Sequence, residues 1–229
     1  MRAVVFDLDG TLIDSVQAIA GIGDRLLAEL GLPPLTLEEA RSYIGNGAAK
    51  FVERALSARG QAVDKAALAP HVARFQLFYA EAPASANVPF PGVERALREL
   101  RSSGVALGLC TNKPAAPTHN VIEGLGWSDL FAAVVTGDTL GVHKPDPAPL
   151  RHCAELLGAD TTASNYAYVG DSEVDAATAE AARVPFFLFT EGYRKTPVEQ
   201  LPHRVLFSDF ARLPELLLNL NELGEVKTP

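Results

Sequence analysis

Two aspartates separated by a single residue, Asp7 and Asp9, lie at the end of the first apolar run of the chain, Ala3–Leu8. Side chains two positions apart on an extended chain point the same way, so both carboxylates can project into one crevice. Gly10 and Thr11 then let the chain turn. Two carboxylates at a strand end repel each other unless a cation or a shared proton intervenes. For this segment alone, a turn or a calcium-type loop is an equal alternative.

A hydroxyl, an amide and a lysine follow later in the chain. Thr111 and Asn112 come directly after the apolar run Val105–Cys110, where they can hold phosphoryl oxygens. The alternative is a helix N-cap or an Asx turn, the usual task of Thr and Asn at such a place. Lys144 precedes Pro145, which restricts the backbone of its neighbour and steadies the lysine. A fixed cation beside carboxylates can stabilise both them and a phosphate.

A second acid pair, Asp171 and Asp175, follows the apolar run Tyr166–Val169 and spans one helical turn. Such oxygen donors suit Mg²⁺, which takes few protein carboxylates and keeps several waters. The alternative is that Asp171 caps the helix that begins nearby. The pair therefore indicates a magnesium site if the sheet brings it close to the first pair.

Short apolar runs alternate with helical patterns along the chain, which predicts the α/β fold class with a Rossmann-like parallel sheet. Most runs are continuously apolar, as in parallel strands covered on both faces. Open sheets of this kind bind ligands beyond the carboxyl ends of their strands, where all four polar groups stand. The predicted strands are Ala3–Leu8, Val105–Cys110, Ala133–Thr136, Tyr166–Val169 and Pro185–Phe189, with a short candidate strand at Arg204–Phe207.

An insertion lies between the first two strands, since residues 9–104 are far too many for a simple crossover. It contains helical patterns only: Gly31 ends the first helix, and Thr36 with Glu39 fits a capping box that opens the second. The predicted division is a small inserted α-helical domain at residues 15–86 and an α/β core at residues 1–14 and 87–229.

Composition narrows the choice of partners. The net charge of −8 argues against broad nucleic-acid binding, but it is compatible with a small anionic substrate. Cys110 and Cys153 build neither a disulfide framework nor a zinc site. The sequence shows no signal-like segment and no apolar stretch long enough to span a membrane. We therefore expect a cytoplasmic protein without a membrane partner.

Taken in order, the acid pair, the hydroxyl with amide, the lysine and the second acid pair resemble the four motifs of the haloacid dehalogenase superfamily. The helical insertion after the first motif is similar in position to the cap domain of that superfamily. At Arg183 the sequence departs from the family, because a glycine is expected there in the turn after the motif-four helix. The matching segments are Asp7-Leu8-Asp9-Gly10-Thr11, Thr111-Asn112-Lys113, Lys144-Pro145 and Gly170-Asp171-Ser172-Glu173-Val174-Asp175.

The resemblance implies a Mg²⁺-dependent phosphatase that acts on a small phosphorylated metabolite, a phosphate monoester. Asp7 would be the nucleophile and form an aspartyl-phosphate, and Asp9 would serve as acid and then as base. Mg²⁺ would be held by Asp7, Asp171 and the backbone carbonyl of Asp9. The groups expected to bind the phosphate are Thr111, Asn112 and Lys144, with Thr11 in support and Asp175 supporting Lys144 or a metal-bound water.

Two segments, Gly108–Pro114 and Tyr43–Gly47, are most similar to phosphoglycolate phosphatases. This similarity implies 2-phosphoglycolate as the substrate, with glycolate and phosphate as products. The residues expected to contact the substrate carboxylate are Gly45, Asn46 and Gly47 with the nearby Lys50 or Arg54. The alternative is a helix–loop–helix turn with solvated charges.

Other functions remain open at this point. A sugar-phosphate phosphatase or a β-phosphoglucomutase-like isomerase would share the fold, and a non-catalytic phosphate-binding protein would share the site. A receiver-like signalling module also combines acids, a hydroxyl and a lysine around Mg²⁺. Such a module is a single small domain, however, and has no reason to carry the helical insertion. The sequence makes no prediction of oligomeric state.

Overall fold

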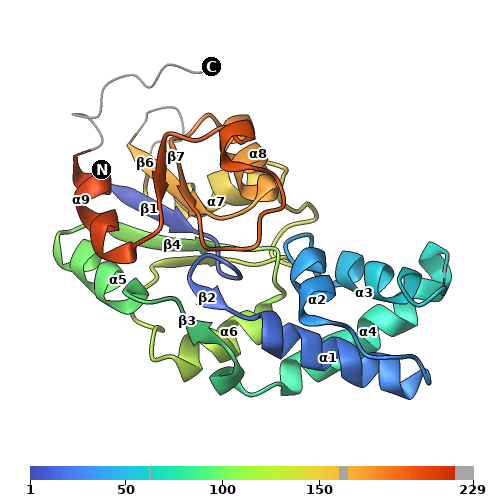
Figure 1. Ribbon diagram of the computed structural model, residues 1–229. Coiled ribbons are helices and arrows are strands. Elements are labelled where there is room, and N and C mark those ends of the chain that lie inside the picture. The colour runs from blue at the N-terminus through green and yellow to red at the C-terminus, as the bar shows by residue number, and fades with distance from the viewer. Residues whose placement is uncertain (62, 160–164, 220–229) are drawn as a thin grey trace.

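The computed structural model describes residues 1–61, 63–159 and 165–219 (Figure 1). Its centre is a six-stranded parallel sheet with the strand order β5-β4-β1-β6-β7-β8. Phe6 of β1 is in register with Leu109 of β4 and Val169 of β6. The predicted α/β fold class is confirmed. The strands are β1 (Ala3–Phe6), β4 (Ala106–Cys110), β5 (Ala133–Val135), β6 (Tyr166–Gly170), β7 (Phe186–Phe189) and β8 (Val205–Phe207).

Both faces of the sheet are covered, as the continuously apolar runs predicted. In β1, Val4 and Phe6 join one buried cluster while Ala3 and Val5 join the other, because successive side chains of a strand alternate between faces. Side chains of α5, α6 and α9 complete the first cluster, and those of α7 and α8 complete the second (Figure 1). The helices are α5 (Val93–Ser102), α6 (Ala115–Gly124), α7 (Ala148–Leu156), α8 (Glu173–Ala182) and α9 (Leu213–Leu218).

In its described residues the insertion forms four α-helices with a buried cluster of their own, which includes Leu27, Val52 and Phe75. We call α1 to α4 the helical body; it lies beside the sheet in Figure 1. Thr36 and Glu39 form the predicted capping box. We propose that the helical body is the cap domain expected at residues 15–86. Its helices are α1 (Val16–Glu29), α2 (Leu37–Tyr43), α3 (Ala48–Ser57) and α4 (Lys65–Glu81).

We call the six-stranded sheet with the helices that cover it the sheet domain. A small antiparallel pair of strands joins the helical body to the sheet domain, and this pair was not predicted. β2 (Ile13–Asp14) carries the chain out and β3 (Val88–Pro89) brings it back, with Asp14 opposite Val88. Each strand holds only two residues, too few for an alternating pattern to be visible in the sequence. The segment Pro83–Pro91, which leads from the helical body back to the sheet, contains β3 and the short 3₁₀ helix η1 (Ala84–Ala86). Two further 3₁₀ helices are η2 (Val198–Gln200) and η3 (Phe210–Arg212).

Arg183 adopts the left-handed backbone conformation that its expected glycine would have adopted, with φ 61° and ψ 45°. It ends α8 in a turn in which the N–H groups of Arg183 and Val184 donate to the carbonyls of Glu180 and Ala179. A side chain disfavours this conformation by about 1–2 kcal/mol. The departure from the family therefore changes the energy of a turn and not its shape.

Replacing Arg183 with glycine is expected to stabilise the protein. Relief of the left-handed strain outweighs the extra chain entropy of glycine by about 0.5–1 kcal/mol, which raises the melting temperature by about 2 °C. Differential scanning calorimetry measures the shift. Arg183→Ala is the matched control, since it removes the long side chain but keeps the Cβ atom. A glycine variant no more stable than the alanine variant would contradict the explanation.

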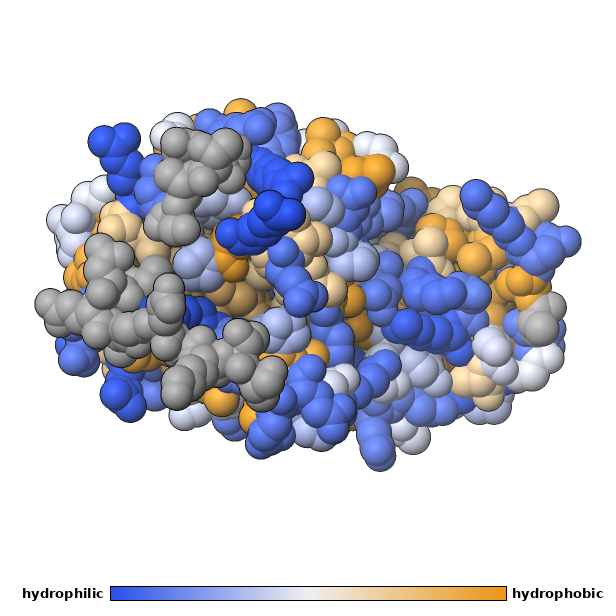
Figure 2. Space-filling model, turned by 90° about the horizontal axis from the view of Figure 1, so that it is seen from above, coloured by the Kyte–Doolittle hydropathy of each residue, from blue (hydrophilic) through white to orange (hydrophobic). Residues whose placement is uncertain are grey.

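The face of the molecule seen in Figure 2 is largely hydrophilic, and its apolar residues form separate small areas. Within residues 1–61, 63–159 and 165–219, no helix combines the length and the apolar character needed to cross a membrane. Cys110 and Cys153 are both buried free thiols in the second cluster.

Candidate active site

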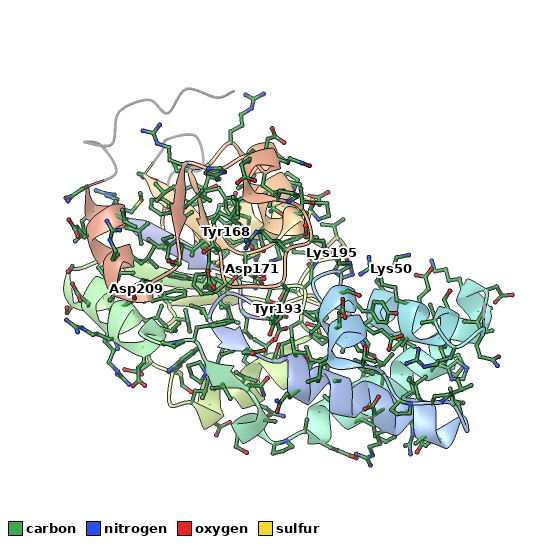
Figure 3. All side chains as sticks on the ribbon, viewed as in Figure 1. Lys50, Tyr168, Asp171, Tyr193, Lys195 and Asp209 are labelled. Carbon is green, nitrogen blue, oxygen red and sulfur yellow. The ribbon has the colours of Figure 1, made fainter. Side chains whose placement is uncertain are left out.

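The parallel strands bring the two predicted acid pairs and the lysine to one edge of the sheet. The ammonium of Lys144 lies 2.8 Å from Asp7 Oδ1 and 2.7 Å from Asp175 Oδ1. Carboxylate oxygens of Asp7, Asp171 and Asp175 all lie within 4.8 Å of one another, and the three residues are buried. Figure 3 shows Asp171 close to Tyr168 in the middle of the molecule, with Tyr193 toward the helical body. The four motifs therefore meet at a single site.

Hydrogen bonds hold both the side chain and the backbone of Lys144. Its ammonium donates to the hydroxyl of Tyr168 at 2.8 Å, and the side-chain amide of Asn112 accepts from its N–H and donates to its carbonyl, both at 3.0 Å. The peptide bond to Pro145 is cis. Burial alone would lower the pKa of Lys144, but Asp175 and Asp7 outweigh it and the pKa is raised. The lysine is thus a fixed cation at neutral pH.

Asp171 is fixed by two donors from distant parts of the chain. The hydroxyl of Thr11 donates to Oδ1 and the backbone N–H of Tyr193 donates to Oδ2, each at 2.6 Å. Gly10 has a positive φ of 88°, and a Cβ atom there would lie 2.6 Å from Asp171 Oδ2. Glycine is therefore required in the turn after Asp9 for two reasons, its conformation and its lack of a side chain.

Asp175 combines a structural bond with a site contact. Its Oδ2 accepts from the N–H of Ser172 at 3.1 Å in a capping box, so Ser172 is the N-cap of α8. The alternative that Asp171 caps this helix is wrong. Oδ1 of Asp175 faces Lys144 and accepts a 2.6 Å bond from Tyr168. Burial raises the pKa of Asp175, yet Lys144 and these hydrogen bonds outweigh it and leave the pKa lowered.

Negative charge exceeds positive charge in this cluster, since Lys144 is one cation beside three carboxylates. Burial, only partly offset by Lys144, raises the pKa of Asp7 to about 7. Burial, Asp175 and Asp7 raise the pKa of Asp171 well above its usual range. Buried oxygen donors with surplus charge fit a hard divalent cation such as Mg²⁺. Asp7 and Asp171 are the residues that could hold it, because Asp175 is committed to Lys144.

The affinity of the metal-free protein for Mg²⁺ is expected to rise with pH. Metal ligands must be deprotonated, and with a pKa of about 7 the ionised fraction of Asp7 grows about tenfold between about pH 6 and pH 8. Isothermal titration calorimetry should therefore show binding at least about tenfold tighter at the higher pH. Asp129→Asn, an exposed change far from the cluster, should keep this dependence. Equal affinity at both pH values would contradict it.

Asp9 stands apart from the three clustered carboxylates. Its Oδ1 lies 2.9 Å from the ammonium of Lys113, whose side chain is fully buried. That ammonium also lies 4.7 Å from the ring centroid of Tyr79 in α4. Lys113 belongs to the second predicted motif, but the sequence predicted no role for it. The only available signal was its place after Thr111-Asn112, which does not reveal a partner 104 residues earlier in the chain.

The two predicted phosphate-binding residues of the second motif are both buried beside the cluster. The side chain of Asn112 is fully engaged, because its amide also donates to the carbonyl of Gly45 at 3.0 Å. Its backbone N–H has no acceptor within the described ranges. The hydroxyl of Thr111 accepts a 3.2 Å bond from the N–H of Lys113 and can still donate. A backbone N–H and a hydroxyl thus remain free for a phosphoryl group.

The loop Gly45–Gly47 of the helical body reaches the site, but its basic neighbours do not. Gly45 and Gly47 line one cavity with Asp7 and Asp9. Lys50 is paired with Glu53 at 2.6 Å on the surface of the helical body, and Figure 3 shows it away from Asp171. Arg54 donates to the carbonyl of Tyr43 at 3.2 Å. The contact of Lys50 or Arg54 with a substrate stays a prediction that this geometry does not favour.

The loop after β7 also contributes to the site and was not predicted. The hydroxyl of Tyr193 donates to Asp14 and accepts from the N–H of Ser15, both at 2.7 Å. The same residue donates its N–H to Asp171. Tyr193 therefore ties the site to the β2 crossing at the start of the helical body.

Comparison with known families decides the classification of this fold and site. The model of the haloacid dehalogenase-like hydrolases matches residues 1–183. The chain belongs to that family. The resemblance predicted from the four motifs is confirmed, and this hydrolase shares 48% identity over 220 residues with a phosphoglycolate phosphatase of Cereibacter sphaeroides, covering 96% of this chain and 99% of the relative. The family and this relative support the expected enzyme class, a phosphoric monoester hydrolase.

Two solved structures are similar to this hydrolase over almost the whole chain. A predicted phosphoglycolate phosphatase of Haemophilus somnus has a TM-score of 0.87 at 26% identity, covering 95% of this chain and 98% of that one. A β-phosphoglucomutase of Clostridium difficile has a TM-score of 0.78 at 18% identity, covering 97% and 98%. The second similarity shows the fold alone, so the fold does not separate hydrolysis from isomerisation.

Proposed function

We propose that this hydrolase is a Mg²⁺-dependent phosphatase that cleaves 2-phosphoglycolate to glycolate and phosphate through an aspartyl-phosphate on Asp7. The observation that carries the proposal is the contact of Lys144 with Asp7, 2.8 Å apart, inside a buried cluster of three carboxylates. Such a cluster offers a nucleophile, a fixed cation and oxygen donors for a metal at the carboxyl ends of the parallel strands. The similarity to a phosphoglycolate phosphatase over 96% of the chain supports the substrate.

Mg²⁺ would be held by the carboxylates of Asp7 and Asp171 and by the backbone carbonyl of Asp9. When bound, it would offset the repulsion between an anionic nucleophile and a phosphate dianion. Lys144, the hydroxyl of Thr111 and the backbone N–H of Asn112 would bind the equatorial phosphoryl oxygens, on which charge accumulates during transfer.

The reaction proceeds in two displacements. An oxygen of Asp7 forms a bond to phosphorus while the bond to the ester oxygen breaks, and Asp9 donates a proton to that leaving oxygen. Asp9 then takes a proton from a water, which attacks the aspartyl-phosphate and releases inorganic phosphate. Both carboxylates return to their starting states. The helical body, which lines the cavity beside Asp9 with Gly45 and Gly47, would limit the access of bulk water in the first step.

A panel of substrates tests the proposal. Release of inorganic phosphate is measured with 2-phosphoglycolate, hexose phosphates, pyridoxal phosphate and nucleoside monophosphates, before and after treatment with EDTA and readdition of Mg²⁺. We expect the highest kcat/KM with 2-phosphoglycolate and loss of activity without metal. An isomerised sugar phosphate in place of free phosphate would favour the mutase. A stable phosphoprotein without turnover would favour a receiver-like module, and no reaction at all would favour a non-catalytic binding protein.

A further inference from the structure

Among the described residues that line the cavity shared by Asp9, Gly45 and Gly47, Lys113 is the only one with a cationic side chain. An ammonium has three N–H donors, and within the described ranges the hydrogen bond to Asp9 is the only one that the ammonium of Lys113 makes. Its side chain is nevertheless fully buried. A buried charged group with unused donors is costly unless a ligand completes its bonding. Lys113 therefore has the capacity to bind an anionic or polar group in the cavity.

A second unused donor lines the same cavity. Tyr79 of α4 is buried, and its hydroxyl has no hydrogen-bond partner in the part of the chain that the structure describes. The ammonium of Lys113 lies 4.7 Å from the centroid of its ring. One residue belongs to the sheet domain and the other to the helical body, so the pair forms only where these two parts meet. An ammonium over the face of a phenol ring, with N–H and O–H donors unused, is suited to a carboxylate, which accepts several hydrogen bonds.

The remaining wall of the cavity limits the size and polarity of the ligand. Most of the side chains around Lys113 and Tyr79 are apolar and offer a sugar's hydroxyl groups nothing to bond. Such a wall favours a short ligand whose polar end is met by the two donors. The apolar wall is formed by Ile19, Ile44, Ala48, Phe51 and Phe75.

We propose that Lys113 and Tyr79 bind the carboxylate of the substrate's leaving group, an assignment that rests on the proposed phosphatase function. In that function the ester oxygen lies against Asp9, the group that protonates it. The ammonium of Lys113 is 2.9 Å from Asp9, so it lies next to the substituent that the ester oxygen carries. In 2-phosphoglycolate the carboxylate carbon is only two bonds from that oxygen. The phosphorus end stays with Asp7 and Lys144.

The experiment compares two substrates that differ only at this end. They are 2-phosphoglycolate and 2-hydroxyethyl phosphate, in which a hydroxymethyl group replaces the carboxylate. We expect Lys113→Met to lower kcat/KM for 2-phosphoglycolate about 100-fold more than for 2-hydroxyethyl phosphate. Tyr79→Phe, which removes one oxygen atom, should lower the same ratio about fivefold. Lys65→Met, a change on the exposed start of α4, is the matched control and should leave the ratio unchanged.

Product inhibition separates carboxylate binding from support of Asp9. In Lys113→Met the inhibition constant of glycolate should rise at least about tenfold, while that of inorganic phosphate should not change. An equal loss with both substrates and an unchanged glycolate constant would overturn the assignment, since Lys113 would then act only through Asp9. If Lys113→Met does not fold, an unaltered ratio in Tyr79→Phe overturns it. A parent enzyme that hydrolyses both substrates equally well overturns this inference alone, whereas one that hydrolyses no phosphate monoester overturns the proposed function as well.

Discussion

Replacing Asp7 with asparagine is expected to lower kcat on the order of 10⁴-fold or more, the loss usual when an enzyme's nucleophile is removed. The amide matches the carboxylate in shape and fills the same buried site, but it is neutral and cannot attack phosphorus. It also withdraws one ligand from the proposed metal site. Lys144 keeps its ion pair with Asp175 at 2.7 Å, so the cation proposed to bind the phosphate stays in place. Substrate binding should therefore fall much less than turnover.

The same substitution is not expected to destabilise the metal-free protein at about pH 8. The pKa of Asp7 is raised to about 7 in the folded state from its ordinary value of 3.8. This shift lowers the free energy of unfolding. The loss is absent below the pKa of the unfolded state, grows as the pH rises toward the pKa of the folded state, and is complete above that value. Asparagine does not titrate and avoids that loss. Single-turnover kinetics measures the loss of turnover, and thermal melts measure the change in stability. Mass spectrometry excludes protein in which the asparagine has deamidated to aspartate. Asp129→Asn is the control. Retention of parental turnover would show that Asp7 is not the nucleophile.

Replacing Asp9 with asparagine is expected to slow the first displacement in proportion to the basicity of the leaving group. With 2-phosphoglycolate, whose alkoxide needs a proton, the loss should be on the order of 10³-fold. With p-nitrophenyl phosphate, whose phenolate leaves unaided, the first step should slow about tenfold or less. The second displacement also uses Asp9, so hydrolysis of the aspartyl-phosphate should become limiting for both substrates.

Rapid-mixing kinetics with p-nitrophenyl phosphate measures this difference directly. The Asp9→Asn enzyme should release a burst of nitrophenolate equivalent to its active sites, followed by slow turnover, and the trapped phosphoprotein should carry its label on Asp7. Asp129→Asn should behave as the parent. A first step slowed equally for both substrates, with no burst, would refute the acid–base assignment of Asp9.

Most of the sheet could be predicted because its strands are buried on both faces. Runs such as Tyr166–Val169 carry this burial in their composition, and the strand ends then place Asp171 beside Asp7 without knowledge of any long-range contact. The α1 to α4 helices were predictable from spacing and from the capping box of Thr36 and Glu39. Neither inference needed information from outside the local sequence.

The features that were missed depend on pairings between distant residues. In the sequence Lys113 is one of six lysines, and nothing local shows that the fold buries it against Asp9. Tyr79 belongs to the apolar face of a helix, and its contact with Lys113 forms only when α4 packs against the sheet domain. Asn112 was predicted at the site, but its side chain joins Gly45 of the helical body to Lys144, a long-range connection that no local pattern encodes. Lys50 was predicted to contact the substrate because of its charge, but it forms an ion pair with Glu53 at the surface.

The pairing of Asp14 with Val88 across β2 and β3 has a consequence for how such a chain can arise. Residues paired in an antiparallel ladder have Cα atoms about 5 Å apart, a gap that a tight turn of a few residues can span. The chain thus leaves the sheet domain at β2 and returns to it at β3 at neighbouring points. A segment of any length can be added or exchanged there without disturbing the order of the six strands. Such a junction permits modular change: the carboxylates of Asp7 and Asp171 stay with the six-stranded sheet, while the inserted segment that supplies Tyr79 can be exchanged for another.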